Sequence, residues 1–313
     1  MGHFLGIDGG GSKTAVWCAN ERGQVLGKGM AGPTNLTTTD TQLACENLTI
    51  ALEQALSGSA KPSFTSVVMG LAGADTPTEI NQARAIFQTV FASHGIQDFK
   101  LVNDAVIALK SGSDAPNSLV VIAGTGSNCF GRNSMGETAK ASGLDYWLSD
   151  DGSGYMIGLQ ALRAVVRASD GRGEATELTK LVFDHFKLTS ASALKEVVYA
   201  PGFSKREMAA LTMVVVQAAE LGDITAFQIL IQAINEIQIM MQAVIQKLSL
   251  EQSAFDAVAV GSVMTLSIVK KRLSTWFAAR YPQARLIYPE QPPVYGALQL
   301  AYQAAFLAES TRT

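Results

Sequence analysis

A glycine-rich hairpin near the start of the chain constrains the fold more than any other feature. Residues 4–17 read FLGIDGGGSKTAVW, which is an apolar strand, three successive glycines and a second apolar strand. Glycine permits positive φ and lets the backbone approach a ligand closely, and the N–H groups of such a turn form an anion-binding concavity. The segment therefore predicts a phosphate-binding β-hairpin, with an ordinary glycine hairpin as the alternative.

The side chains of this hairpin support a nucleotide phosphate as the anion. Asp8 ends the first strand, where a carboxylate suits a hydrated Mg²⁺, and Ser12 and Thr14 carry hydroxyls that can reach the same anion. A Walker A loop needs glycine directly before its lysine, whereas Ser12 precedes Lys13. A Rossmann turn leads into a helix, but the residues after these glycines, TAVWCA, are typical of a strand.

Composition limits the classes of protein that fit. A chain of 313 residues with 48% apolar and 16% charged residues can form two domains with sizeable cores. Its net charge of −3 argues against nucleic acid or an anionic membrane as the main partner. No signal peptide and no run of ~18 apolar residues is recognisable, which predicts a cytoplasmic protein. The three cysteines are far apart and indicate neither disulfides nor a metal cluster.

The order of elements predicts a mixed α/β protein whose second half becomes helical. The first hundred residues predict strands near 3–8, 14–19, 24–30, 65–71 and 99–102, with helices over 39–56 and 78–91. A second strand–glycine turn–strand unit follows, with strands over 118–123 and 128–132 around Gly124-Thr125-Gly126-Ser127. Beyond it the sequence predicts helices over 153–168, 174–186, 204–219, 223–248, 261–280 and 294–308, with strands over 255–260 and 285–288.

Three polar positions lie where strands or turns end, and each has two interpretations. Asp104 follows a strand and can act as the base in phosphoryl transfer, or can cap the helix 105–110. Asn35 can bind a sugar diol, or can form an Asx-turn. Asp150 can accept hydrogen bonds from sugar hydroxyls, while Asp151 or Ser153 caps the helix that follows.

Taken in order, these segments resemble the sugar kinase–actin–heat-shock chaperone superfamily, in particular N-acetylglucosamine kinases and BadF/BadG/BcrA/BcrD-type ATPases. The similar motifs extend over nearly the whole chain. They are the first phosphate loop (6–14), GLAGA (70–74), Asn103-Asp104, the second phosphate loop (123–127), SDDGSG (149–154), an adenosine motif (260–263) and Tyr295-Gly296-Ala297.

The resemblance implies an α/β fold of two actin-like, ribonuclease H-like domains with mixed five-stranded sheets flanked by helices. ATP, Mg²⁺ and a sugar are expected in the interdomain cleft. The N-terminal domain is expected over 1–110, with the C-terminal helix 294–313 packing back on it. The helix-rich second domain is expected over 111–293.

The resemblance also implies roles for single residues. Asp104 takes the proton of the sugar 6-hydroxyl, and Asn35, Asn103, Asp104 and Asp150 contact the sugar. Asp8 holds Mg²⁺, through water. The residues expected to bind the nucleotide are Asp8, Gly9, Gly10, Gly11, Ser12, Lys13, Thr14, Gly124, Thr125, Gly126, Ser127, Gly261, Ser262 and Gly296.

One departure from the family pattern leaves the substrate open. Many N-acetylglucosamine kinases carry Gly-Trp-Gly shortly before the segment at 149–154, where this chain has GLDYW over 143–147. The expected activity is phosphorylation of N-acetylglucosamine, with glucosamine as an alternative sugar and a non-catalytic ATP-binding regulator as an alternative class. The resemblance and the apolar segment 223–248 favour a homodimer.

Overall fold

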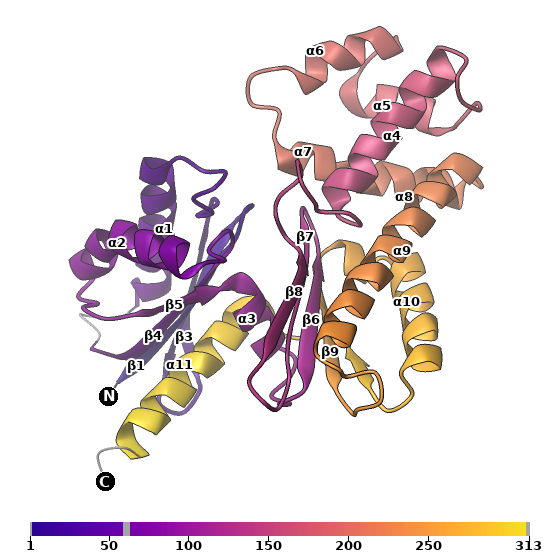
Figure 1. The fold of residues 1–313 in the computed structure, drawn as a ribbon. Helices are drawn as coiled ribbons and strands as arrows, with labels where there is room; N and C mark the ends of the chain where they lie inside the picture. The colour runs from indigo at the N-terminus through magenta and orange to yellow at the C-terminus, as the bar shows by residue number, and fades with distance from the viewer. Residues whose placement is uncertain (1, 59–62, 311–313) are drawn as a thin grey trace. The chain divides into compact units, whose positions relative to one another are not determined.

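The chain divides into two compact units, each built around its own sheet (Figure 1). The computed structural model describes residues 2–58 and 63–310. Unit 1 is Met1–Asp114 with Tyr288–Thr313, and unit 2 is Ala115–Ile287. The predicted ranges 1–110 and 294–313 include residues 1, 59–62 and 311–313, which lie outside the described residues.

The sheet of unit 1 contains five strands in the order β3-β2-β1-β4-β5. They are β1 (His3–Gly9), β2 (Thr14–Asn20), β3 (Val25–Ala31), β4 (Phe64–Leu71) and β5 (Lys100–Asn103). The first three form antiparallel hairpins, whereas β4 lies parallel to both β1 and β5. In this register Asp8 lies opposite Ala15 of β2 and Gly70 of β4, at the ends of the strands.

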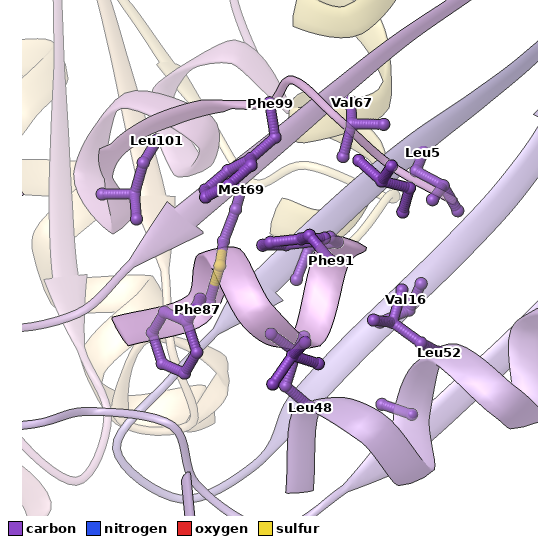
Figure 2. Close-up of a cluster of buried hydrophobic side chains, with 14 of the residues drawn as sticks. Leu5, Val16, Leu48, Leu52, Val67, Met69, Phe87, Phe91, Phe99 and Leu101 are labelled. Atoms are coloured by element: carbon purple, nitrogen blue, oxygen red, sulfur yellow. The ribbon is translucent and has the colours of Figure 1, made fainter. Parts of the chain in front are cut away.

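One face of this sheet is covered by α1 (Thr41–Leu56) and α2 (Pro77–Ser93). Strand residues point alternately to the two faces, so Leu5 and Ile7 both contribute to the core under these helices. Figure 2 shows the phenylalanines of α2, Phe87 and Phe91, packed with Leu48 and Leu52 of α1. Full burial of each such side chain contributes about 1.5–3 kcal/mol.

The opposite face is covered by α3 (Asp104–Lys110) and the C-terminal helix α11 (Pro293–Ser310). Close contact requires glycine here, because a Cβ at Gly6 of β1 would lie 2.5 Å from the nitrogen of Leu298. On this face Phe4 and Val68 of the sheet pack with Ile107 and Leu298. The last helix of the chain is thus part of the first unit.

The sheet of unit 2 repeats the arrangement, with strands in the order β10-β9-β6-β7-β8. They are β6 (Ser118–Ala123), β7 (Ser127–Arg132), β8 (Thr138–Ser142), β9 (Asp256–Val260) and β10 (Arg285–Ile287). Strands β6, β7 and β8 are antiparallel neighbours, and β9 is parallel to β6 and β10. The two mixed five-stranded sheets flanked by helices confirm the predicted α/β fold.

Helices make up most of the rest of unit 2. They are α4 (Gly154–Ser169), α5 (Leu178–Phe186), α6 (Leu194–Val198), α7 (Lys205–Ala210), α8 (Thr212–Glu220), α9 (Ile224–Lys247) and α10 (Ser267–Arg280), with short 3-10 turns at Ala191–Ala193 and Val263–Thr265. Among the described helices, α9 is long and apolar enough to cross a membrane. This indication is weak, because α9 packs against β6, β7 and β8 as the core helix of a globular unit does.

Several predicted boundaries are wrong in unit 2. Strand β8 was not expected, and the helix predicted over 174–186 begins only at Leu178. The helix predicted over 204–219 is interrupted at Leu211, and the helix predicted from 261 begins at Ser267 after a 3-10 turn. The predicted strands of unit 1 and its long helices are confirmed within a few residues.

Candidate active site

The first glycine turn joins β1 to β2 and is held by hydrogen bonds on three sides. The nitrogen of Gly10 donates to the carbonyl of Lys13 at 2.9 Å, which closes the turn. Thr34 donates from its backbone to the carbonyl of Gly10 at 3.2 Å, and Ala72 donates to the carbonyl of Gly9 at 2.9 Å. The turn is therefore fixed by the segments that follow β3 and β4.

Close packing accounts for the glycine at position 9. Gly9, Gly10 and Gly11 all lie outside the left-handed region of φ, so the expectation of positive φ in this turn is wrong. A Cβ at Gly9 would lie 2.6 Å from Oγ1 of Thr34 and 2.9 Å from Cε of Met69. A Cβ at Gly11, which is exposed, would make only ordinary contact with Nδ2 of Asn35 at 3.7 Å.

The hydroxyl of Thr14 is used inside the hairpin. Thr14 is fully buried, and its Oγ1 donates to the carbonyl of Gly32 at 2.8 Å and lies 3.0 Å from Oγ1 of Thr34. Ser12 is half-buried and Lys13 is exposed. The structure thus gives Thr14 a role in joining β2 to the turn after β3, and its contact with phosphate stays a prediction.

Two carboxylates of unit 1 lie close enough to influence each other. Loss of solvation on burial is the main cause that raises the pKa of Asp8 to about 7, and the negative charge of Asp104 raises it further, against an opposing effect of Lys13. Asp8 is the last residue but one of β1, and Asp104 is the first residue of α3, directly after β5. The parallel arrangement of β1, β4 and β5 brings these strand ends to one edge of the sheet.

The N-cap of α3 is Asn103, and the alternative in which Asp104 caps this helix is wrong. Oδ1 of Asn103 accepts from the backbone of Ala105 at 2.9 Å. Nδ2 of Asn103 donates to Oδ1 of Asp75 at 2.8 Å and lies 3.3 Å from the carbonyl of Ala74. Asp75, which directly follows the GLAGA segment, was not singled out in the sequence, and it orients the residue that precedes Asp104.

Asn35 forms the Asx-turn that the sequence left open, and it also lies beside the glycine turn. Its Oδ1 accepts from the backbone of Thr37 at 2.9 Å. A Cβ at Gly73, whose φ is +76°, would lie 2.5 Å from that same Oδ1. Asn35 is therefore held between the GLAGA segment and Gly11, with its side-chain amide on the side of Gly11. An Asx-turn and a sugar contact are compatible, because they use different atoms of the amide.

The second glycine turn joins β6 to β7 and contacts the start of α4. The nitrogen of Gly124 donates to the carbonyl of Gly126 at 2.9 Å. The backbones of Gly154 and Tyr155 donate to the carbonyls of Gly124 and Thr125 at 2.8 and 3.3 Å. Ser153 is the side-chain cap of α4, since its Oγ accepts from Met156 at 3.2 Å, so of the two predicted caps the serine is confirmed.

Asp150 lies directly against this turn and is 3% exposed. Its Oδ1 accepts from the backbone of Ser127 at 3.0 Å, and its Oδ2 lies 2.6 Å from Nζ of Lys205. A Cβ at Gly126 would lie 2.9 Å from Oδ2 of Asp150, which explains the glycine at that position. The structure thus brings together Gly126, Ser127 and Asp150, and adds Lys205, which the sequence did not indicate.

The remaining residues that were predicted to bind the nucleotide lie partly beside the second glycine turn and partly on α11. Gly261 follows β9 at a φ of +113°, and a Cβ at Gly124 would lie 3.8 Å from its Cα, so Gly261 and Ser262 adjoin the second glycine turn. Gly296 is buried on α11, where a Cβ would lie 2.0 Å from the carbonyl of Ile107. Helix packing therefore explains Gly296, and a nucleotide contact there is not needed to account for it.

The carboxylates of unit 1 suit a cation such as Mg²⁺. Among the described residues, no three His, Cys, Asp or Glu side chains are grouped to hold a metal ion. Mg²⁺ needs no such group, because it keeps several waters and binds through one or two carboxylates together with substrate phosphates. Asp8, with its poorly solvated carboxylate next to Asp104, fits that description.

The sequence of the chain matches a family model over residues 5–301, that of the BadF/BadG/BcrA/BcrD ATPase family. The chain belongs to this family. It is 31% identical over 305 residues to an N-acetylmuramic acid/N-acetylglucosamine kinase of Clostridium acetobutylicum, covering 96% of this chain and 98% of that protein. It is 29% identical over 312 residues to an N-acetyl-D-glucosamine kinase of Dictyostelium discoideum, covering 95% and 97% of the two chains.

The fold of this BadF-type ATPase is also found in solved structures. A crystal structure of a candidate N-acetylglucosamine kinase from Porphyromonas gingivalis matches with a TM-score of 0.72 at 20% identity, covering 97% of this chain and 99% of that one. At this identity the likeness shows the fold alone. That fold agrees with the actin-like α/β architecture expected from the motifs.

Proposed function

We propose that this BadF-type ATPase is an ATP-dependent hexosamine kinase that phosphorylates the 6-hydroxyl of N-acetylglucosamine. The observation that carries the proposal is the position of Asp104, at the end of β5 on the sheet edge where Asp8 and the first glycine turn lie. The names of the two curated relatives reported above support the sugar class. Glucosamine is the alternative substrate.

In this proposal the residues of unit 1 act on the phosphate groups and on the proton of the sugar. Asp104 accepts the proton of the 6-hydroxyl while the sugar oxygen attacks the γ-phosphorus, and the bond from that phosphorus to the bridging oxygen of ADP breaks. The first glycine turn binds phosphate oxygens through its backbone N–H groups, and Asp8 holds Mg²⁺. When bound, this ion neutralises charge on the phosphates.

The sugar is held by groups that are already fixed in the protein. Asn35 and Asn103 are oriented by the Asx-turn and by Asp75, so little side-chain entropy is lost on binding. In unit 2, we assign Asp150 to the sugar hydroxyls, and Gly124–Ser127 with Gly261 and Ser262 to the nucleotide. A cytoplasmic homodimer is the assembly expected for this enzyme.

A sugar panel tests the proposal directly. We expect the purified protein to release ADP from ATP and Mg²⁺ only when N-acetylglucosamine or a closely related hexosamine is present. Glucose, mannose and buffer alone serve as controls, and the position of the phosphate in the product is read by NMR. Slow hydrolysis that no sugar stimulates would instead favour a non-catalytic ATP-binding regulator.

A second prediction concerns Asn35 and uses two variants. Asn35→Asp keeps the oxygen that accepts from Thr37 but loses the side-chain donor, so the sugar KM should rise about 10-fold or more. The ATP KM should change little in Asn35→Ala, which adds no charge beside the first glycine turn. Asn35→Ala also loses the Asx-turn and should in addition lower the melting temperature. A change confined to the ATP KM would place Asn35 in the nucleotide site and contradict the assignment.

A further inference from the structure

Lys205 occupies a position that local helix energetics disfavour. It is the first residue of α7, a helix whose start is fixed by a capping box. Ser204 accepts from the backbone of Glu207 at 3.3 Å, and Glu207 accepts from the backbone of Ser204 at 2.6 Å. A cation in the first turn opposes the helix dipole, which favours negative charge there. A lysine at this position therefore needs another reason.

Two carboxylates of unit 2 supply that reason. Nζ of Lys205 lies 2.6 Å from Oδ2 of Asp150 and also forms an ion pair with Asp145. The side chains of Lys205 and Asp145 are 25% and 28% exposed, whereas that of Asp150 is only 4% exposed. A charge as buried as that of Asp150 is costly unless it is paired and hydrogen-bonded. Lys205 is the cation that pairs with it.

This ion pair is one link in a chain of contacts that runs from α7 to the second glycine turn. Asp150 uses Oδ2 for Lys205 and Oδ1 for the backbone of Ser127, so its carboxylate is held from both sides. The backbone of Asp150 has a φ of +70°, a conformation that costs energy for a residue with a side chain. Such a conformation persists where the surroundings determine it, as these two partners do.

The segment that leads to Asp150 is fixed by the same lysine. Ser142, Gly143 and Asp145 have φ values of +64°, +79° and +69°. The ammonium of Lys205 lies 5.6 Å from the ring centre of Tyr146, in addition to its ion pair with Asp145. One side chain from α7 thus holds both the loop before Asp150 and the carboxylate itself.

We propose that Lys205 is a positioning residue of the sugar site, which holds the carboxylate of Asp150 in the orientation that accepts sugar hydroxyls. This inference rests on the proposed function, in which Asp150 contacts the sugar. Lys205 acts through Asp150 and does not itself touch substrate. Its removal should therefore weaken sugar binding much more than ATP binding, and should have no further effect once Asp150 has lost its charge.

The first experiment separates sugar binding from catalysis. Lys205→Met removes the ammonium and keeps the length of the side chain, and we expect the sugar KM to rise about 10- to 100-fold, as for loss of a buried hydrogen bond to a charged group. The ATP KM should rise much less than the sugar KM, because the second glycine turn is also held by the backbones of Gly154 and Tyr155. Arg206→Met is the matched control, since Arg206 is the exposed neighbour of Lys205 on the same helix. An unchanged sugar KM in Lys205→Met would overturn the proposal.

A double-mutant cycle tests whether Lys205 acts through Asp150, and it gives an answer even if Lys205→Met folds poorly. Asp150→Asn and Lys205→Met/Asp150→Asn both avoid an unpaired buried carboxylate at position 150. We expect these two variants to share the same raised sugar KM. A further rise of more than about threefold in the double variant would show that Lys205 acts independently of Asp150, and would overturn the proposal.

Amide hydrogen exchange gives a readout that needs no activity. Lys205→Met should speed exchange in peptides that cover 124–127, because the acceptor for the backbone of Ser127 loses its second partner. Arg206→Met should leave exchange there unchanged, and equal exchange in wild type and Lys205→Met would overturn the proposed link. If the wild type turns over no sugar, the proposed function fails, and with it the role in a sugar site, even where the exchange result holds.

Discussion

Asp104→Asn is expected to lower kcat by roughly 10²- to 10⁴-fold while ATP and sugar still bind. The reason is that general base catalysis acts at the chemical step, and asparagine cannot take the proton of the sugar hydroxyl. The helix should tolerate this change well, because Asn103 and not Asp104 provides the cap of α3. The measurements are steady-state turnover, binding of each substrate by calorimetry, and a melting curve.

A neighbouring aspartate provides the control for this variant. Asp114 lies just beyond α3, pairs with Lys110 and has a side chain that is 77% exposed, so Asp114→Asn removes the same charge away from the sheet edge. Its turnover should equal that of the wild type. Turnover close to wild type in a well-folded Asp104→Asn protein would contradict the assignment of Asp104 as the base.

The folding pattern of unit 1 could be predicted from sequence because its signals are local. Strands β1 and β4, for example, are short apolar runs that are mostly buried, and glycines and polar residues mark where the strands end. Strand β8 escaped prediction because its residues are half-buried or exposed and are small or polar. It is an edge strand that owes its conformation to pairing with β7, which a local pattern does not reveal.

Candidate residues were predictable where they form part of a motif, whereas their partners were not. Asp75 lies 28 residues from Asn103, and Lys205 lies 55 residues from Asp150. Only the folded chain brings such pairs together, and a lone lysine in a helical segment carries no signal of its own. The choice between Asn103 and Asp104 as the helix cap was also open, since both residue types are good caps and stand side by side.

For the glycines, too, the sequence indicates where they occur in the turns but not why glycine is required there. The turn at 9–11 was expected to use glycine for positive φ, yet Gly9, Gly10 and Gly11 all lie outside the left-handed region. At Gly9 and Gly126 a Cβ would instead crowd Thr34 and Asp150. The motif was recognised correctly, but only the three-dimensional packing reveals its cause.

Asp8→Asn is expected to abolish most activity and yet to stabilise the protein at alkaline pH. Activity falls because a neutral amide holds Mg²⁺ poorly compared with a carboxylate. Stability rises because the carboxylate of Asp8 is poorly solvated in the folded state and is repelled by Asp104, which together raise its pKa from 3.8 to about 7. Ionised Asp8 therefore works against folding, as is common for residues placed for function.

The sign of the pH dependence follows from proton binding. Between the pKa of 3.8 in the unfolded chain and about 7 in the folded state, the folded protein binds more protons at Asp8. The stability contributed by this group is thus fully present below pH 3.8 and is lost as the pH rises through about 7. Since one pKa unit corresponds to about 1.4 kcal/mol, Asp8→Asn should gain about 2.6 kcal/mol more over wild type at about pH 8 than at about pH 5.

Urea unfolding of wild type and Asp8→Asn at the two pH values measures this difference, and the double variant with Asp104→Asn isolates its cause. Because the charge of Asp104 contributes to the raised pKa of Asp8, removing that charge should lower this pKa. The loss of stability with rising pH should then end at a lower pH than in wild type. The gain from Asp8→Asn should then be smaller in the Asp104→Asn background than alone, since the two sites are coupled. Equal gains in both backgrounds would mean that the two carboxylates do not interact, and would remove the electrostatic basis for placing Mg²⁺ beside the proposed base.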